Sequence, residues 1–166
     1  MQIYVAGSHR LSEWDKKEIY QYLEKYAAVN HIHLLAFKSI ENEVLRFFLE
    51  NEALAPRLSV YTLPSLECLP EPFCGAITYL QELGASHQHF YYYDTQIAKT
   101  KLELFQEAII EKMDLVCCFY NGDKPADMIP VDVAKQLGVQ SAIYDLPKQK
   151  KHLIYRSNGD KIRLVN

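Results

Sequence analysis

The chain has no excess of positive charge and no long hydrophobic segment. Among its 166 residues, 18 Lys and Arg stand against 21 Asp and Glu, which gives a formal net charge of −3. Binding driven by the phosphate backbone of nucleic acid needs a clear cationic excess, so we do not expect nucleic acid as a partner. No stretch approaches the ~20 apolar residues of a membrane span, so we expect no membrane association either.

Motifs of several common site classes are also absent. The sequence contains no P-loop, no serine nucleophile elbow and no zinc-finger spacing. Its four cysteines form no C-x-x-C pair, which favours reduced thiols in a cytoplasmic protein. Neither of two H-x-H pairs has a third ligand that can be placed beside it, so we expect no metal and no cofactor. The run at 1–7 lacks the length and basic flank of a signal peptide, which also indicates the cytoplasm.

Tyrosine, by contrast, is abundant. The chain holds 12 Tyr against 7 Phe and 1 Trp. Because tyrosine joins an apolar ring to a polar hydroxyl, this excess indicates half-exposed surfaces such as pockets and subunit interfaces. Tyr20, Tyr22 and Tyr26 fall on one predicted helix, beyond what its inward face needs. We therefore expect that helix to form the contact face of a homo-oligomer.

Short β-branched and aromatic runs alternate with segments of helical periodicity, in a chain of a length that favours one domain. Strands are predicted at 2–6, 31–37, 58–63, 115–120 and 141–144, with 87–93 also extended. Helices are predicted after an N-cap at Ser12 and at 40–51, 76–83, 94–112 and 129–137, whereas 64–75 is too rich in proline to be regular. This alternation predicts an α/β fold, namely a Rossmann-like three-layer sandwich with a mostly parallel sheet.

The last residues break the alternation. Two extended runs, 152–156 and 161–165, flank the segment Ser157-Asn158-Gly159-Asp160, and Asn-Gly is a strong hairpin signal. We expect a Rossmann-like domain over 1–147 and a basic C-terminal β-hairpin over 148–166 that packs on it.

Ligands of open parallel sheets bind outside the carboxyl ends of the strands, and two loops fall there. The first, Gly7-Ser8-His9-Arg10, combines a glycine, a hydroxyl and a guanidinium with a helix that begins shortly afterwards, which suits a phosphate or another anion. An ordinary strand-to-helix turn with a surface arginine is the simpler alternative.

The second loop, 121–127, follows the most apolar strand. Its backbone amides lead into a helix and offer another anion site, while Asp123, Lys124 and Asp127 offer contacts to hydroxyl groups; a solvated turn is the alternative. Tyr93, just before the predicted helix cap at Asp94, and Tyr120, at the end of the strand that leads into this loop, are candidates for stacking on a base. The predicted ligand-binding residues are Gly7, Ser8, His9, Arg10, Tyr93, Tyr120, Asn121, Gly122, Asp123 and Asp127.

The opening QIYVAGSHR with its following helix, and the later segment MDLVCCFYNGDKPADMIPVDVAKQLGVQSAIYDL, resemble the SLOG superfamily of Rossmann-like nucleotide-binding proteins. Its members include nucleoside 2-deoxyribosyltransferases and lonely-guy phosphoribohydrolases. The resemblance covers most of 1–147 as a pattern of elements and implies a Rossmann-like fold with a nucleotide-type ligand.

The chain departs from those enzymes at their catalytic glutamate. Pro130 occupies that position, and proline has no carboxylate that could attack an anomeric carbon. The resemblance therefore implies binding of a nucleotide, nucleoside or ADP-ribose-type small molecule without evident catalysis. The alternatives are an N-glycosidase or nucleoside deoxyribosyltransferase that uses a displaced acid, Asp127 or Asp132, and a non-catalytic oligomeric scaffold.

Overall fold

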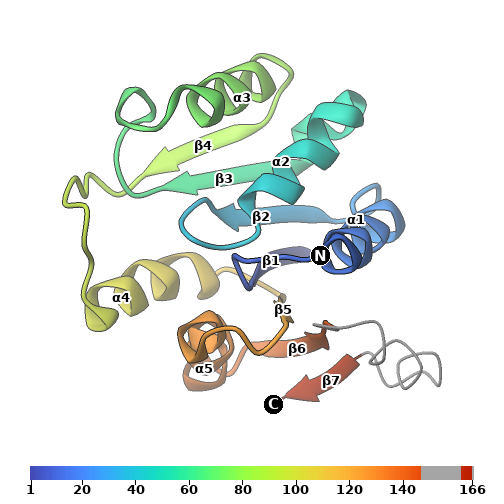
Figure 1. Cartoon of the computed structure of the whole chain (residues 1–166), viewed down its shortest axis with the longest axis vertical. Coiled ribbons are helices and arrows are strands. Elements are labelled where there is room, and N and C mark those ends of the chain that lie inside the picture. The colour runs from blue at the N-terminus through green and yellow to red at the C-terminus, as the bar shows by residue number, and fades with distance from the viewer. Residues whose placement is uncertain (147–161, 166) are drawn as a thin grey trace.

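A single sheet of seven strands forms the centre of the molecule (Figure 1). The computed structural model describes residues 1–146 and 162–165. The strand order is β4-β3-β2-β1-β5-β6-β7, in which β1 to β6 are parallel and β7 is antiparallel to β6. The strands are β1 (Gln2–Gly7), β2 (His31–Leu35), β3 (Leu58–Thr62), β4 (Ser86–His89), β5 (Leu115–Tyr120), β6 (Gln140–Asp145) and β7 (Ile162–Val165).

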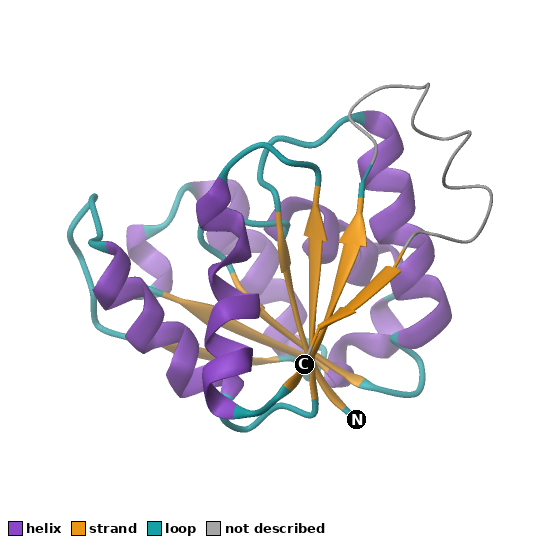
Figure 2. Ribbon diagram, turned by 90° about the horizontal axis from the view of Figure 1, so that it is seen from below, coloured by secondary structure: helices purple, strands orange, loops and turns teal. Residues whose placement is uncertain are grey.

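Helices cover both faces of this sheet (Figure 2). One face packs against α1 (Glu13–Tyr26), α2 (Glu41–Glu50) and α3 (Glu71–Glu82), and the other against α4 (Lys99–Ile110) and α5 (Ile129–Leu137). Short 3₁₀ turns lie at η1 (Glu52–Arg57), η2 (Leu66–Cys68) and η3 (Pro125–Met128). The predicted three-layer, Rossmann-like α/β sandwich is confirmed. Within the described ranges no helix is both long and apolar enough to cross a membrane.

Local sequence signals explain several of these elements. Ser12 and Asp15 form the predicted capping box at the start of α1, with Ser12 Oγ accepting from the Asp15 amide at 3.2 Å. The apolar run of β5 is covered on both faces, as expected for a central parallel strand. Gly138 ends α5 with φ 70°, the left-handed conformation that glycine adopts without a steric penalty.

Two helix starts differ from the sequence prediction. Helix α3 begins at Glu71 rather than 76, because Pro72 falls in its first turn, where proline costs no hydrogen bond. Helix α4 begins at Lys99 rather than Asp94. The preceding segment is instead held along the sheet edge, where the Phe90 and Tyr92 amides donate to the Leu63 carbonyl at 3.2 and 3.0 Å.

The tyrosines of α1 are also placed differently from the prediction. Tyr22 is buried, with its hydroxyl 3.1 Å from the Cys117 sulfur, and Tyr20 donates to Glu50 at 3.0 Å. Tyr26 packs its ring on that of Tyr22 at a centroid distance of 4.7 Å. Each of the three rings makes contacts within the chain, and the oligomer face on α1 stays a prediction.

Strand β7 corresponds to the second arm of the predicted hairpin, and it pairs with β6 in the register Ala142 to Leu164. The first arm, 152–156, and the turn at 157–160 lie outside the described residues. The division of the chain at residue 147 stays a prediction.

Candidate functional site

The sheet has a topological switch point between β1 and β5. From β1 the chain adds β2, β3 and β4 on one side, then crosses to place β5 and β6 on the other. At such a point the loops that follow two neighbouring strands diverge to opposite faces and leave a crevice at the carboxyl ends. Here the crevice is a cavity of about 720 Å³, formed by the loops after β1, β2 and β5 together with α4.

The first loop is anchored through Gly7 and Ser8. The Gly7 amide donates to Ser39 Oγ at 3.0 Å, and the Ser8 amide donates to the Phe119 carbonyl at 2.9 Å. A Cβ on Gly7 would collide with that Phe119 carbonyl. We expected Gly7 to allow the close approach of a ligand, but its missing side chain instead allows the close approach of strand β5. Ser8 is fully buried and its Oγ accepts from the Asn121 amide at 3.1 Å, so the hydroxyl binds the second loop.

Asn121 connects the two loops. Its side-chain amide donates to the Arg10 carbonyl at 2.7 Å and to Asp15 Oδ2 at 3.2 Å, while its Oδ1 accepts from the Asp123 amide at 2.9 Å. Gly122 completes the turn with φ 84°. Because every polar group of the Asn121 side chain is engaged within the chain, we assign this residue to positioning the loops rather than to the ligand contact we predicted.

His9 stands on the rim beside a buried carboxylate. Its Nδ1 lies 2.9 Å from the Ser39 carbonyl and 3.1 Å from Glu41 Oε2. Glu41 is 3 % exposed, and burial raises its pKa. Hydrogen bonds to the carboxylate, such as the one of 2.8 Å that the Ser39 amide donates, act to lower the pKa and only partly offset the effect of burial. The glutamate thus fixes the orientation of a half-exposed imidazole at the mouth of the cavity.

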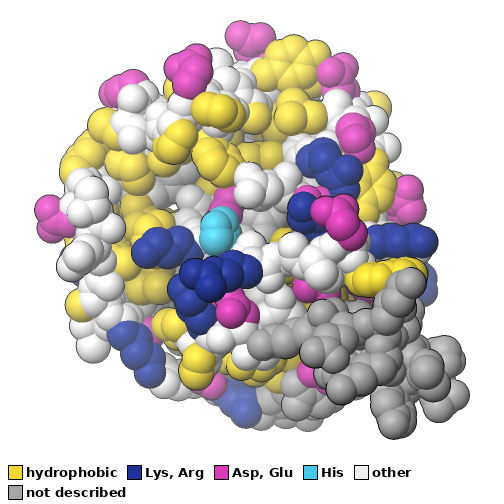
Figure 3. Space-filling view, in the orientation of Figure 1, with side chains coloured by type: hydrophobic (Ala, Val, Ile, Leu, Met, Phe, Trp, Pro, Cys, Tyr) yellow, Lys and Arg dark blue, Asp and Glu magenta, His cyan; other side chains and the backbone are white. Residues whose placement is uncertain are grey.

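Positive charge is concentrated around this cavity. The four cationic residues Arg10, Lys38, Lys99 and Lys124 line it, against the two carboxylates of Asp123 and Asp127. In the space-filling view, Lys and Arg side chains gather beside a histidine on this part of the surface (Figure 3). The local charge therefore has the opposite sign to the net charge of −3 for the whole chain.

Lys38 has an unusual backbone conformation. Its φ of 46° is one of only two positive values at non-glycine residues in the described part of the chain. Such a conformation is uncommon for a lysine, and strained residues of this kind cluster at functional sites. The ammonium group lies 5.4 Å from the centre of the Phe37 ring, so charge and aromatic surface are presented together.

Asp127 and Pro130 also line the cavity. One Asp127 oxygen accepts from the Lys124 amide at 3.3 Å, and burial raises the pKa of this carboxyl. Pro130 lies in the first turn of α5, the structural role expected for it. Asp132 is not among the residues that line the cavity, so a displaced catalytic acid at that position has no support from the geometry.

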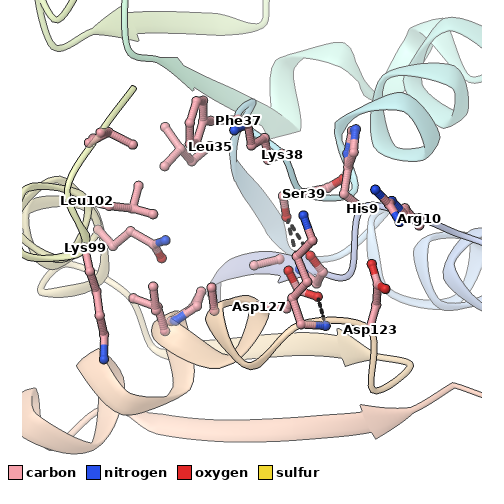
Figure 4. A pocket seen from close by; sticks show the side chains of 18 of the residues that line it. His9, Arg10, Leu35, Phe37, Lys38, Ser39, Lys99, Leu102, Asp123 and Asp127 are labelled. Atoms are coloured by element: carbon pink, nitrogen blue, oxygen red, sulfur yellow. Dashed lines mark hydrogen bonds between the residues drawn. The ribbon is translucent and has the colours of Figure 1, made fainter. Parts of the chain in front are cut away.

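The other side of the cavity is apolar. Figure 4 shows Leu35, Phe37 and Leu102 on the side of the opening away from Arg10 and Asp123, with Lys38 and Lys99 beside them. Deeper in, the buried Tyr4 hydroxyl donates to Gln106 Oε1 at 3.3 Å, and both residues line the cavity. The cavity therefore combines a charged rim, an apolar wall and a side-chain amide.

The N-terminus of α4 opens onto the same cavity. Its N-cap is Ala98, which makes no side-chain capping bond, and Gln96, Ile97 and Lys99 line the wall. Free amides at a helix N-terminus carry partial positive charge and attract anions. The first turn of α4 holds no acidic residue that would compensate them.

The structure brings about half of the predicted site residues together. Gly7, His9, Arg10, Asp123 and Asp127 line the cavity. The other five lie elsewhere, namely Ser8, Asn121, Gly122, Tyr93 and Tyr120. Tyr120 packs against the cluster of Cys118, Val131 and Ile143 instead of facing a ligand.

Sequence reasoning missed Phe37, Lys38, Ser39 and Lys99. Lys38 and Ser39 directly follow the predicted strand at 31–37, and by the carboxyl-end rule their position was a usable signal. Lys99 gave no signal, because we placed it inside a helix. Across the described ranges, no group of three or more His, Cys, Asp or Glu side chains is arranged to hold a metal ion.

Comparisons with known proteins support the fold. No family model and no curated protein matches the chain. Among solved structures it is similar to DNA processing protein A from Helicobacter pylori, with a TM-score of 0.64 and 14 % identity over 95 % of this chain and 73 % of that one. That structure is described in terms of a single-stranded DNA binding mode. The similarity establishes the Rossmann-like fold; the resemblance to the SLOG superfamily stays a prediction.

This neighbour corrects two sequence predictions. We expected a small nucleotide- or nucleoside-type ligand, with a glycosidase or a scaffold protein as the alternative functions. We also expected that the chain does not bind nucleic acid. The similar structure instead belongs to a protein that binds single-stranded DNA. The physical reason for the error is that we judged nucleic-acid binding from net charge, whereas binding depends on the local potential at one surface.

Proposed function

We propose that the cavity at the carboxyl edge of the sheet binds single-stranded nucleic acid. The observation that carries this proposal is the placement of Arg10, Lys38, Lys99 and Lys124 around an apolar-walled opening. Proteins that bind single strands combine a cationic groove, which follows the phosphates, with apolar or aromatic surfaces for the bases. The single-stranded DNA binding of a protein with the same fold supports the proposal.

The phosphates have two sources of attraction here. The guanidinium of Arg10 offers paired donors that match phosphate oxygens, and the lysines add flexible charges. The uncapped α4 N-terminus adds amide donors on the same rim. Asp123 and Asp127 oppose these groups, but the cavity retains more cations than anions.

The wall suits an unstacked base. A volume of about 720 Å³ accommodates a nucleotide, and Leu35, Phe37 and Leu102 supply an apolar surface beside it. The Gln106 amide offers hydrogen bonds to a base edge. Bases in a duplex are stacked inside the helix and cannot enter such a cavity unless they are flipped out, so the shape favours a single strand.

Fluorescence anisotropy with labelled oligo(dT) tests the proposal. We expect the wild-type protein to bind, and Arg10→Ala and Lys38→Ala each to weaken binding by roughly 3- to 10-fold, as for loss of one hydrogen bond of about 1 kcal/mol. Lys25→Ala is the matched control, because Lys25 lies in the last turn of α1, at the other end of that helix from the cavity. The same oligonucleotide hybridised to oligo(dA) should bind more weakly.

Absence of measurable binding by the wild-type protein at low salt would refute the proposal. Equal losses for Lys25→Ala and Arg10→Ala would also refute it, because the attraction would then come from the general surface rather than from the cavity.

A further inference from the structure

A row of aromatic side chains lies next to the cavity, along the segment that joins β4 to α4. Tyr91 and Tyr93 are 75 % and 56 % exposed, and Tyr91 is the most exposed large hydrophobic residue of the described chain. Exposed apolar residues that lie together in one patch mark interaction surfaces. Neither ring lines the cavity itself.

The backbone displays these two rings on a fixed support. Alternate residues of the segment face inward, where Phe90 and Tyr92 pack on Phe105 at centroid distances of 4.7 and 5.7 Å. The intervening Tyr91 and Tyr93 are left on the outside. The packing of the Phe90 and Tyr92 rings, and the hydrogen bonds from their backbone amides to the Leu63 carbonyl, thus hold the outward-facing Tyr91 and Tyr93 in place.

Tyr91 is also held in a strained conformation. Its φ of 56° lies in the left-handed region, which is a genuine outlier for so bulky a residue. The His89 ring packs against it at 4.2 Å in an edge arrangement, which leaves much of the ring surface open. Lys38 on the cavity rim is the other residue of this kind. Because strained backbone conformations cluster at functional sites, the strain at Lys38 and Tyr91 favours a functional role for the surface that carries them.

The aromatic row continues directly into the cavity wall. The Tyr92 hydroxyl donates to the Gln96 carbonyl at 2.7 Å, and Gln96 lines the cavity. Because Tyr93 precedes Gln96 by three residues, their Cα atoms are at most about 11 Å apart. Lys99 and Lys101, both exposed, follow in the first turn of α4. A strand leaving the cavity here would meet two lysines and then two aromatic rings.

We infer that Tyr91 and Tyr93 form a second base-stacking surface, on which the nucleotides next to the one held in the cavity are bound. This inference rests on the proposed function and extends it from a single pocket to a path along the carboxyl edge. The occupant is a single-stranded nucleic acid, because its bases have planar faces for the rings and its phosphates match the lysines.

Ligands of two lengths separate the two surfaces. A labelled thymidine mononucleotide fits the cavity alone, whereas an oligo(dT) of roughly twelve nucleotides also reaches the rings. For Tyr91→Ala/Tyr93→Ala we expect the longer oligonucleotide to bind at least about fivefold more weakly per ring removed, with no change for the mononucleotide. The double phenylalanine variant keeps both rings and should bind as the wild type does.

Tyr79→Ala is the matched control. Tyr79 is an exposed tyrosine of α3 outside this segment, bonded through its hydroxyl to Glu52, and its removal should leave both affinities unchanged. Tyr93→Trp adds an independent readout that does not depend on removing a ring. Its fluorescence, after subtraction of the Trp14 signal of the wild type, should be quenched by the longer oligonucleotide and not by the mononucleotide.

The outcomes distinguish this inference from the function on which it rests. If the wild type binds both lengths and the double alanine variant matches it on both, the stacking surface is wrong while the cavity proposal stands. Equal losses on both lengths would also overturn the inference, because the rings would then act through the cavity or the fold. If the wild type binds neither length, the proposed function fails, and the inference fails with it.

Discussion

Replacement of Gly7 by alanine should destabilise the protein and distort its site together. Gly7 pairs with Phe119 across the two central strands, and a Cβ at this position would lie closer to the Phe119 carbonyl than the 3.0 Å that real Cβ atoms keep. The same Cβ would lie 3.0 Å from the Phe119 Cβ. The obstructing atoms belong to backbone and to a Cβ, so no side-chain rotation can relieve the contact.

The size of the effect follows from this geometry. Overpacking in a core costs about 1–3 kcal/mol, and a backbone collision between central strands belongs at the upper end, about 3 kcal/mol. For a domain of this size, 1 kcal/mol corresponds to about 2–4 °C in Tm, so we expect a fall of about 6–12 °C. The carboxyl end of β1 must move, which also displaces Arg10 and should weaken oligonucleotide binding.

Gly75→Ala provides a control of the same chemistry. Gly75 lies inside α3 and a Cβ there meets nothing within 4 Å, so alanine should stabilise the protein by about 0.5–1 kcal/mol through its better helix propensity. Urea unfolding followed by circular dichroism measures both free energies. A Gly7→Ala variant as stable as the wild type would refute the reasoning, because the sheet would then accommodate a methyl group against the Phe119 carbonyl.

Three further predictions concern titratable groups. Burial lowers the His33 pKa from 6.5 to about 4, so the unfolded chain takes up a proton at a higher pH than the folded chain does. The free energy of unfolding should therefore fall as the pH drops from 6.5 towards 4, and urea unfolding of His33→Gln should show a smaller decrease over the same range. Burial raises the Glu41 pKa above its ordinary 4.5, so the folded chain holds this proton to a higher pH than the unfolded chain does. The stability that Glu41 contributes should therefore decrease as the pH rises above 4.5, and urea unfolding of Glu41→Gln should lack this decrease. Cys117 and Cys118 are buried and burial raises the pKa of each thiol, so a disulfide-exchange reagent should label them only after denaturation, as peptide mapping would show.

The fold was predictable where the signals are local. The continuous apolar run of β5 and the capping box of Ser12 and Asp15 depend on neighbouring residues only, and both are found as predicted. Asp94 was a good local N-cap, yet α4 starts at Lys99, because hydrogen bonds from the Phe90 and Tyr92 amides to the Leu63 carbonyl hold the preceding segment against the sheet. Tertiary contacts therefore override the local preference there.

The place of the site was predictable, but the roles of its residues were only partly so. The carboxyl-end rule located the loops after β1 and β5. It did not show that Ser8 and Asn121 bond to each other, because that contact joins residues 113 positions apart. Lys99 reaches the same cavity from α4, which no local pattern indicates. Summing charge over the chain also hid the cationic rim, because acidic residues elsewhere cancel it.

The salt dependence of oligo(dT) affinity tests the central claim most directly. If Arg10, Lys38, Lys99 and Lys124 contact phosphates, the logarithm of the association constant should fall with the logarithm of salt concentration at a slope of about −3, as for four contacts on a single strand. Arg10→Ala should make that slope shallower by about 0.7. A slope near zero, or one that Arg10→Ala leaves unchanged, would contradict the account.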